Sequence, residues 1–206
     1  FTSMFQLPQN PSNPGPAYEP VSMENLGWVR YNYFSNRDNL LLMNEQMAIR
    51  EASLYKQAGG STLVEASTMG LGRDPESLRR IAAATGLNIV AGAGFYVDGG
   101  HPEDMDGRTE SELSARIAGE VLYGLDGTDV RAGIIGEIGC SWPLTVNERK
   151  VLRAAASAQR RTGASILIHP GRDPDAPDQV LDVLADAGAD LGRVVMGHLD
   201  RTVDDL

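Results

Sequence analysis

Short apolar runs alternate with longer amphipathic stretches through most of the chain. The apolar runs are bounded by glycine, proline or charged residues, and they predict strands at 62–67, 88–94, 131–139, 164–169 and 193–198. Several are apolar at consecutive positions, which is typical of strands in a parallel sheet, because helices cover both faces of such a sheet. The pattern therefore predicts five buried parallel strands.

The stretches between these strands carry helix start signals. Asp74-Pro75 is an N-cap followed by a first-turn proline, and Thr109 with Glu112 and Thr145 with Glu148 have the spacing of capping boxes. Helices are expected at 44–58, 75–86, 109–124, 148–161 and 177–187. Residues 7–20 hold five prolines, which remove backbone donors, and this segment predicts a loop.

Strict alternation of strand and helix implies right-handed crossovers and a parallel sheet. The strand spacing fits a (β/α)8 TIM barrel, a fold that takes roughly 250 residues. A doubly wound open sheet is the competing fold, but no Gly-x-Gly-x-x-Gly turn opens a helix after the first predicted strand. We expect one α/β domain over 1–206, a partial barrel in which 1–43 is mostly loop and lead-in.

The amino-acid composition limits the classes of binding partner and the cellular compartment that we expect. The net charge of −10 argues against nucleic acid and anionic membranes, since both need a basic face. No apolar run approaches the length of a membrane span. The single cysteine, Cys140, excludes an internal disulfide and favours a reducing, cytoplasmic location. The partners expected are a small-molecule substrate and, as one option, a second copy in a homodimer.

Three of the predicted strands carry polar side chains at or near their carboxyl ends: Glu137, His169 and His198. A buried carboxylate must be paired or bound to a metal, and in a barrel these strand ends converge on one mouth. Imidazole and carboxylate ligands together suit zinc and similar divalent metals. Asp200 is expected to orient a histidine or a water by a hydrogen bond without binding the metal itself. The other candidates at this mouth are Glu65 or Ser67 and Tyr96.

Structural explanations compete with this metal site. A histidine at a strand end is commonly a hydrogen-bonded rim residue, and Glu137 could pair with Arg131 or Arg172. His101 lies in a polar loop with no site role expected, and Cys140 is expected to fill apolar space. On the residues alone, a metal hydrolase and a metal-free protein both stay open.

The stretch from Thr62 to Leu206 resembles the phosphotriesterase family of the amidohydrolase superfamily. The resemblance rests on Ser67-Thr-Met-Gly-Leu-Gly-Arg-Asp74, Asn88-Ile-Val-Ala-Gly-Ala-Gly-Phe-Tyr96, Arg131-Ala-Gly-Ile-Ile135, Gly197-His198-Leu-Asp-Arg-Thr202 and Asp204-Asp-Leu206. The segment Gly136-Glu-Ile-Gly-Cys-Ser-Trp-Pro143 is similar to the phosphotriesterase-related branch rather than to the organophosphate-degrading enzymes.

The resemblance implies a (β/α)8 barrel with two divalent metal ions, usually zinc, bridged by a side chain and a hydroxide. The bridging side chain is often a carboxylated lysine, but a simple register places Gly136 there, and Glu137 is taken as the bridging carboxylate. His169 and His198 fall on the fifth- and sixth-strand ligands.

The same resemblance assigns residues to the substrate pocket. Tyr96 falls where the family has an aromatic at the pocket mouth, and Arg172 is expected to contact an anionic part of the substrate.

Two family features are absent from the sequence. It has no His-x-His pair, and the aspartate expected at the eighth strand, the family's proton acceptor, falls beyond the chain end. We therefore expect the middle of a longer protein, about strands 2 to 6 of a barrel without its first and last strands, inactive by itself.

The function predicted for the whole protein is a metal-dependent hydrolase. A metal-bound hydroxide would cleave an ester, lactone, amide or phosphoester. One alternative is a catalytically dead or incomplete barrel that acts as a binding protein. A weaker one is a metal-free barrel enzyme with Glu137 as general base.

Overall fold

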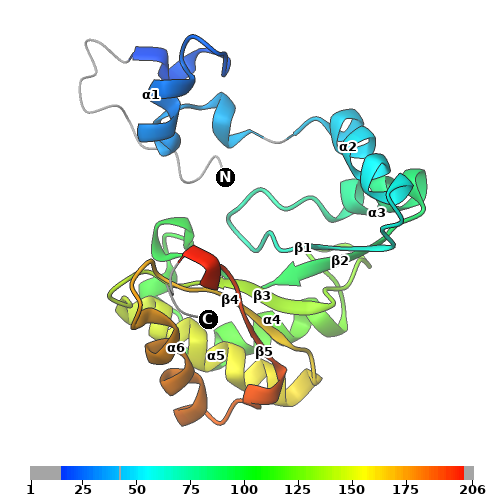
Figure 1. The fold of residues 1–206 in the computed structure, drawn as a ribbon. Coiled ribbons are helices and arrows are strands. Elements are labelled where there is room, and N and C mark those ends of the chain that lie inside the picture. Colours follow the sequence, from blue (N-terminus) through cyan, green and yellow to red (C-terminus); the bar gives the residue numbers. More distant parts are fainter. Residues whose placement is uncertain (1–14, 42, 202–206) are drawn as a thin grey trace.

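A computed structural model describes residues 15–41 and 43–201. Its five strands form one parallel sheet in chain order, a half-barrel (Figure 1). The strands are β1 (Thr62–Glu65), β2 (Asn88–Ala93), β3 (Ile134–Gly139), β4 (Ile166–His169) and β5 (Val194–Met196). The five predicted strands and their parallel pairing are confirmed, although β3 begins later and β5 ends earlier than the apolar runs suggest.

Helices follow each of the first four strands. They are α3 (Pro75–Thr85), α4 (Glu110–Leu122), α5 (Val146–Thr162) and α6 (Ala176–Asp186), and α2 (Glu45–Gln57) precedes β1. Both predicted capping boxes are present, with side chain and backbone of each pair bonded reciprocally. Because Thr145 is the N-cap, α5 begins at Val146, two residues before the predicted start.

The main core lies between the sheet and the helices α4, α5 and α6. Ile135 and Ile138 of β3 are fully buried there, as are Ile117 of α4 and Leu152 of α5. Burial of each such side chain contributes about 2 kcal/mol. This packing fixes the sheet whose strand ends carry the polar residues.

The chain at 15–41 is more regular than the predicted lead-in loop. It contains α1 (Leu26–Tyr31) and the short 3-10 turns η2 (Gly15–Tyr18), η3 (Tyr33–Ser35) and η4 (Asp38–Leu40). The fully buried Asn36 donates to the carbonyls of Pro16 and Glu19, which holds the two ends of this segment together. Phe34 packs against Tyr96, so the segment reaches the carboxyl end of β2.

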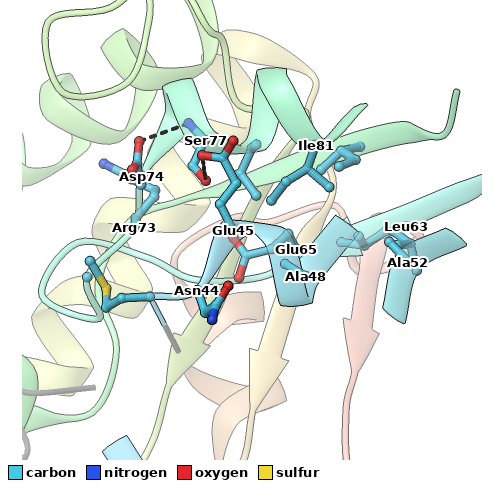
Figure 2. Close-up of a pocket in the computed structure, with 15 residues that line it drawn as sticks. Asn44, Glu45, Ala48, Ala52, Leu63, Glu65, Arg73, Asp74, Ser77 and Ile81 are labelled. Atoms are coloured by element: carbon cyan, nitrogen blue, oxygen red, sulfur yellow. Dashed lines mark hydrogen bonds between the residues drawn. The ribbon is translucent and has the colours of Figure 1, made fainter. Parts of the chain in front are cut away.

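A cavity of about 410 Å³ lies between α2, α3 and strand β1 (Figure 2). One end is polar, where Ser77 donates hydrogen bonds to Glu45 and Asp74, and the other is apolar, with Leu63 and Ile81. None of Glu137, His169 and His198 lines this cavity. It is therefore separate from the predicted metal site.

Within the described residues, no helix combines the length and apolar composition that a bilayer-spanning segment needs.

Candidate metal centre

A β-bulge in β3 aims Glu137 away from the core. The pairing of β3 with β4 shifts register between Ile135 and Ile138, and both of these side chains are fully buried although they are three residues apart. In a regular strand, side chains of one face are two residues apart. The extra residue of the bulge therefore turns Glu137 to the side opposite the two isoleucines, a device that is common beside active sites.

Gly136 has no room for a side chain. Its φ is +127°, and a Cβ atom there would lie 2.2 Å from the carbonyl oxygen of Leu167. A lysine at this position could not be accommodated without moving β4. Position 136 is therefore restricted to glycine in this backbone, and the next residue, Glu137, carries the carboxylate.

Three predicted ligands come together at the carboxyl ends of the strands. Oε1 of Glu137 lies 3.1 Å from Nδ1 of His169, and its Oε2 lies 3.3 Å from Nε2 of His198. The rings of the two histidines meet edge to face, with centroids 4.6 Å apart. One donor atom from each of the three residues lies within 4.8 Å of the others.

The donor set fits a divalent cation. One carboxylate oxygen and two imidazole nitrogens are the ligand types that zinc and related metals take in proteins. Among the described residues, the ion-pair partners of Glu137 are these two histidines rather than Arg131 or Arg172. The structure therefore favours the clustered arrangement over the pairing with arginine.

The charge of Glu137 is stabilised by its neighbours. Burial opposes ionisation, but the hydrogen bond from His169 and the attraction of both imidazoles outweigh it, and they hold the pKa of Glu137 below its ordinary value. The side chains of Glu137 and His169 are 20% and 17% exposed, and that of His198 is 38% exposed. The carboxylate is thus ionised at neutral pH and accessible from the mouth.

Tyr96 completes the wall beside His169. Its hydroxyl lies 3.3 Å from the ring nitrogens of His169, and the two rings meet edge to face. Burial, with a smaller contribution from the negative charge of Glu137, raises the pKa of Tyr96 to about 12. The phenol therefore keeps its proton at neutral pH.

His198 does not end its strand, contrary to the apolar pattern. β5 stops at Met196, and His198 has a left-handed φ of +57°. Gly197 donates its N–H to the carbonyl of Ile168 at 2.9 Å. This bond extends the pairing with β4 by one residue beyond Met196, and the chain turns at His198. After this turn, the imidazole lies beside the Glu137 carboxylate.

Arg201 is a site residue that the sequence analysis does not select. Its Nη2 lies 3.0 Å from Nε2 of His169, and it lies in the short turn η8 (Leu199–Arg201). The signal available in the sequence is its place three residues after His198, on the same turn. Asp200 and Arg172 are both exposed, and their expected roles stay predictions.

Two other residues, His101 and Cys140, serve the packing of the fold rather than the metal centre. Nε2 of His101 lies 2.8 Å from the carbonyl oxygen of Tyr96, and burial lowers the pKa of this imidazole. Cys140 is buried in the main core, as expected for an apolar filler.

The model of the phosphotriesterase family matches residues 14–206. This chain belongs to the phosphotriesterase family. It is 48% identical over 202 residues to the N-acetyltaurine hydrolase of Mus musculus and 47% identical over 199 residues to that of Homo sapiens. These alignments cover 98% and 96% of this chain but 58% and 57% of the two relatives. The chain thus spans somewhat more than half of the length of these relatives.

Solved structures agree with this assignment. A resiniferatoxin-binding protein from Rhodobacter sphaeroides superposes with a TM-score of 0.89 at 38% identity, over 98% of this chain and 56% of that one. A phosphotriesterase homology protein from Escherichia coli, complexed with phosphate in its active site, superposes with a TM-score of 0.76 at 30% identity. This superposition covers 88% of this chain and 60% of that one. The lactonase Lmo2620 from Listeria monocytogenes superposes with a TM-score of 0.75 at 27% identity, over 80% of this chain and 55% of that one. Relatives of this chain are therefore named hydrolases, and the fold is that of the family.

Proposed function

We propose that the protein containing this chain is a metal-dependent hydrolase of the phosphotriesterase-related type, with two divalent ions, zinc by preference. The observation that carries the proposal is the cluster of Glu137, His169 and His198. Glu137 offers one oxygen toward each histidine, so it is the residue suited to a bridging position. His169 would contribute Nδ1 and His198 would contribute Nε2, the atoms that face the carboxylate.

Divalent ions held by such ligands would lower the pKa of a bound water and would polarise a carbonyl or phosphoryl oxygen. The chain's own side chains then bind and orient the substrate. The Tyr96 phenol, protonated at neutral pH, can donate a hydrogen bond to a substrate oxygen at the mouth. Phe34 packs against the cluster formed by Tyr96 and Leu71, so it lies beside the aromatic ring of the phenol.

We infer an anionic substrate, and within the named relatives' chemistry an N-acyl amine with an acidic tail is the best candidate. The positive charges of Arg201 and Arg172 both act to lower the pKa of Tyr96, so both guanidinium groups lie near the phenol. Guanidinium groups recognise carboxylates, sulfonates and phosphates through paired hydrogen bonds. N-acetyltaurine, the substrate in the name of several relatives, is an amide with a sulfonate tail.

The test is a hydrolysis assay with the full-length protein on matched pairs of N-acetyl amines. One member of each pair has a sulfonate or carboxylate tail, and the other has a neutral tail of the same length. The proposal expects turnover that is lost on chelation, restored by zinc or manganese, and faster for the anionic member. Turnover that survives complete metal removal would contradict the metal-dependent mechanism.

A metal-free binding protein is the second candidate. It is favoured by the TM-score of 0.89 to a protein described by what it binds rather than by what it cleaves. The discriminating measurement is metal content after purification in chelator-free buffer. A protein that contains no metal and turns over no member of the panel would support this second candidate.

A further inference from the structure

Glu148 is a fully buried carboxylate that does more than cap its helix. Oε1 accepts hydrogen bonds from the N–H of Asp98 (3.1 Å) and the hydroxyl of Ser141 (2.8 Å), and Oε2 accepts from the N–H groups of Ser141 (3.0 Å) and Thr145 (3.0 Å). A carboxylate has about four lone-pair sites. All of them are used by neutral donors, with no cation beside Glu148 among the described residues.

The donors come from three segments that meet at the mouth. Asp98 follows β2 and Tyr96, Ser141 follows β3 and Glu137, and Thr145 caps α5. A capping box requires only the last of these bonds. The other three join the loop after β2 to the loop after β3.

The loop after β2 is in direct contact with β3, so its position affects the site. A Cβ atom at Gly139 would lie 2.1 Å from the backbone nitrogen of Val97 and 2.9 Å from Cα of Tyr96. Gly139 also donates its N–H to the carbonyl of Phe95 at 3.2 Å. Tyr96 is therefore held between β3, on which it rests, and the anchor at Asp98.

We propose that Glu148 is a positioning residue for the reaction: it fixes the loop at 96–98 so that the Tyr96 hydroxyl stays against His169. The expected effect on kcat/KM rests on the proposed function, whereas the expected effect on the position of the loop at 96–98 does not. Thr145 Oγ1 also donates to the Asp98 carboxylate at 3.0 Å, so Asp98 is tied to the start of α5 through both its backbone and its side chain.

Glu148→Gln breaks one selected part of this network. An amide placed with its nitrogen at the Oε2 position would leave two N–H donors, those of Ser141 and Thr145, without an acceptor. With its nitrogen at the Oε1 position, the Ser141 hydroxyl can rotate and accept from the amide, and only the Asp98 N–H loses its bond. The variant therefore keeps the capping box and releases the loop after β2.

The chain offers a matched control. Glu112 occupies the same place in the other capping box, where it is exposed and where, among the residues that the structure describes, its side chain accepts hydrogen bonds from Thr109 alone. Glu112→Gln alters a capping box without touching the mouth. Any difference between the two variants thus reports the bonds that Glu148 makes beyond its own helix.

The experiment combines hydrogen exchange with a kinetic cycle in the full-length protein. We expect amides at 95–101 to exchange about tenfold faster in Glu148→Gln, with metal content retained, and at the wild-type rate in Glu112→Gln. We expect kcat/KM to fall about tenfold in Glu148→Gln, mainly through kcat, and to change little when Tyr96 is already phenylalanine.

Unchanged exchange at 95–101 would overturn the proposal, because the loop would not depend on Glu148. An equal loss of kcat/KM in the wild-type and Tyr96→Phe backgrounds would overturn it too, because Glu148 would act on folding alone. If the wild-type protein hydrolyses nothing, the proposed function fails, while the exchange measurement still decides whether Glu148 holds the loop.

Discussion

Arg73 and Glu120 form an ion pair in which both side chains are 2% exposed, with Nη2 of Arg73 2.9 Å from Oε1 of Glu120. The pair joins the loop after β1 to α4. Arg73 also donates to the carbonyl of Gly92, and Glu120 accepts from the N–H of Gly94. The two side chains thus clamp the carboxyl half of β2, from which the chain runs to Tyr96.

Glu120→Gln should lower the free energy of unfolding by about 2 kcal/mol, because the buried guanidinium of Arg73 loses the charge of one of its two carboxylate partners and keeps its hydrogen bonds to Asp126. Urea unfolding followed by circular dichroism measures the change. Asp104→Asn is the control, since the Asp104–Arg108 pair is exposed and should contribute nothing measurable. Equal midpoints for the two variants would refute the clamp.

Gly136→Ala should destabilise the fold by roughly 3 kcal/mol, because alanine is strained at a φ of +127° and its Cβ would overlap the Leu167 carbonyl. Gly107→Ala is the control, since a Cβ there meets nothing within 4 Å. Thermal unfolding of both variants checks this. A Gly136→Ala protein as stable as the control would remove the steric reason for placing the carboxylate at Glu137.

Cys140 should be unreactive in the native protein. Burial, with a smaller effect from the charge of Glu148, raises the pKa of the thiol well above its ordinary value, so the folded state disfavours the thiolate. A thiol reagent at pH 8 should modify Cys140 only after denaturation. Rapid modification of the native protein would show that the core around β3 opens.

The same shift makes stability depend on pH in the alkaline range. The unfolded chain loses the Cys140 proton at the ordinary thiol pKa, while the folded chain keeps it. The contribution of the buried Cys140 thiol to the free energy of unfolding is therefore complete below the ordinary thiol pKa. It is lost as the pH rises from there toward the higher pKa of the folded state. Cys140→Ala should flatten this part of the curve of unfolding free energy against pH, and an unchanged slope would contradict it.

If Arg172 binds the anionic tail as proposed, Arg172→Gln should raise KM about tenfold for the anionic N-acetyl amine and leave the neutral analogue within twofold, because the guanidinium–anion contact would be lost. Steady-state kinetics on the matched substrate pairs measures this. Arg153→Gln on α5 removes an exposed arginine and serves as the control for net charge. An equal rise in KM for both substrates would mean that Arg172 shapes the pocket without recognising charge.

The five strands and the capped helices are predictable from the sequence because their signals are local. Apolar runs bounded by glycine mark β2 and β4, and Asp74 and Thr109 sit at the helix starts that their side chains cap. Glu137 stands out because a carboxylate inside an apolar run must be paired or bound to a metal, and His169 and His198 stand out because they close two neighbouring apolar runs. Parallel pairing brings the carboxyl ends of these strands to one edge of the sheet.

The remaining features depend on contacts that sequence does not encode locally. The bulge beside Glu137 arises from the register between β3 and β4, and the turn at His198 from a bond between Gly197 and Ile168. The two capping boxes look alike in sequence, yet only Glu148 is buried and reaches the neighbouring loops. Arg201 reaches His169 through a long side chain, which spacing alone does not place.

The most direct test of the metal centre is the metal content of the full-length protein, wild type against Glu137→Gln. Glutamine keeps the shape but removes the charge that faces both histidines, and Glu103→Gln, on an exposed loop, is the control. We predict two divalent ions per wild-type and control chain by elemental analysis, and a loss of metal with abolished hydrolysis in Glu137→Gln. Wild-type metal content in Glu137→Gln would contradict the role of this carboxylate as the bridging ligand.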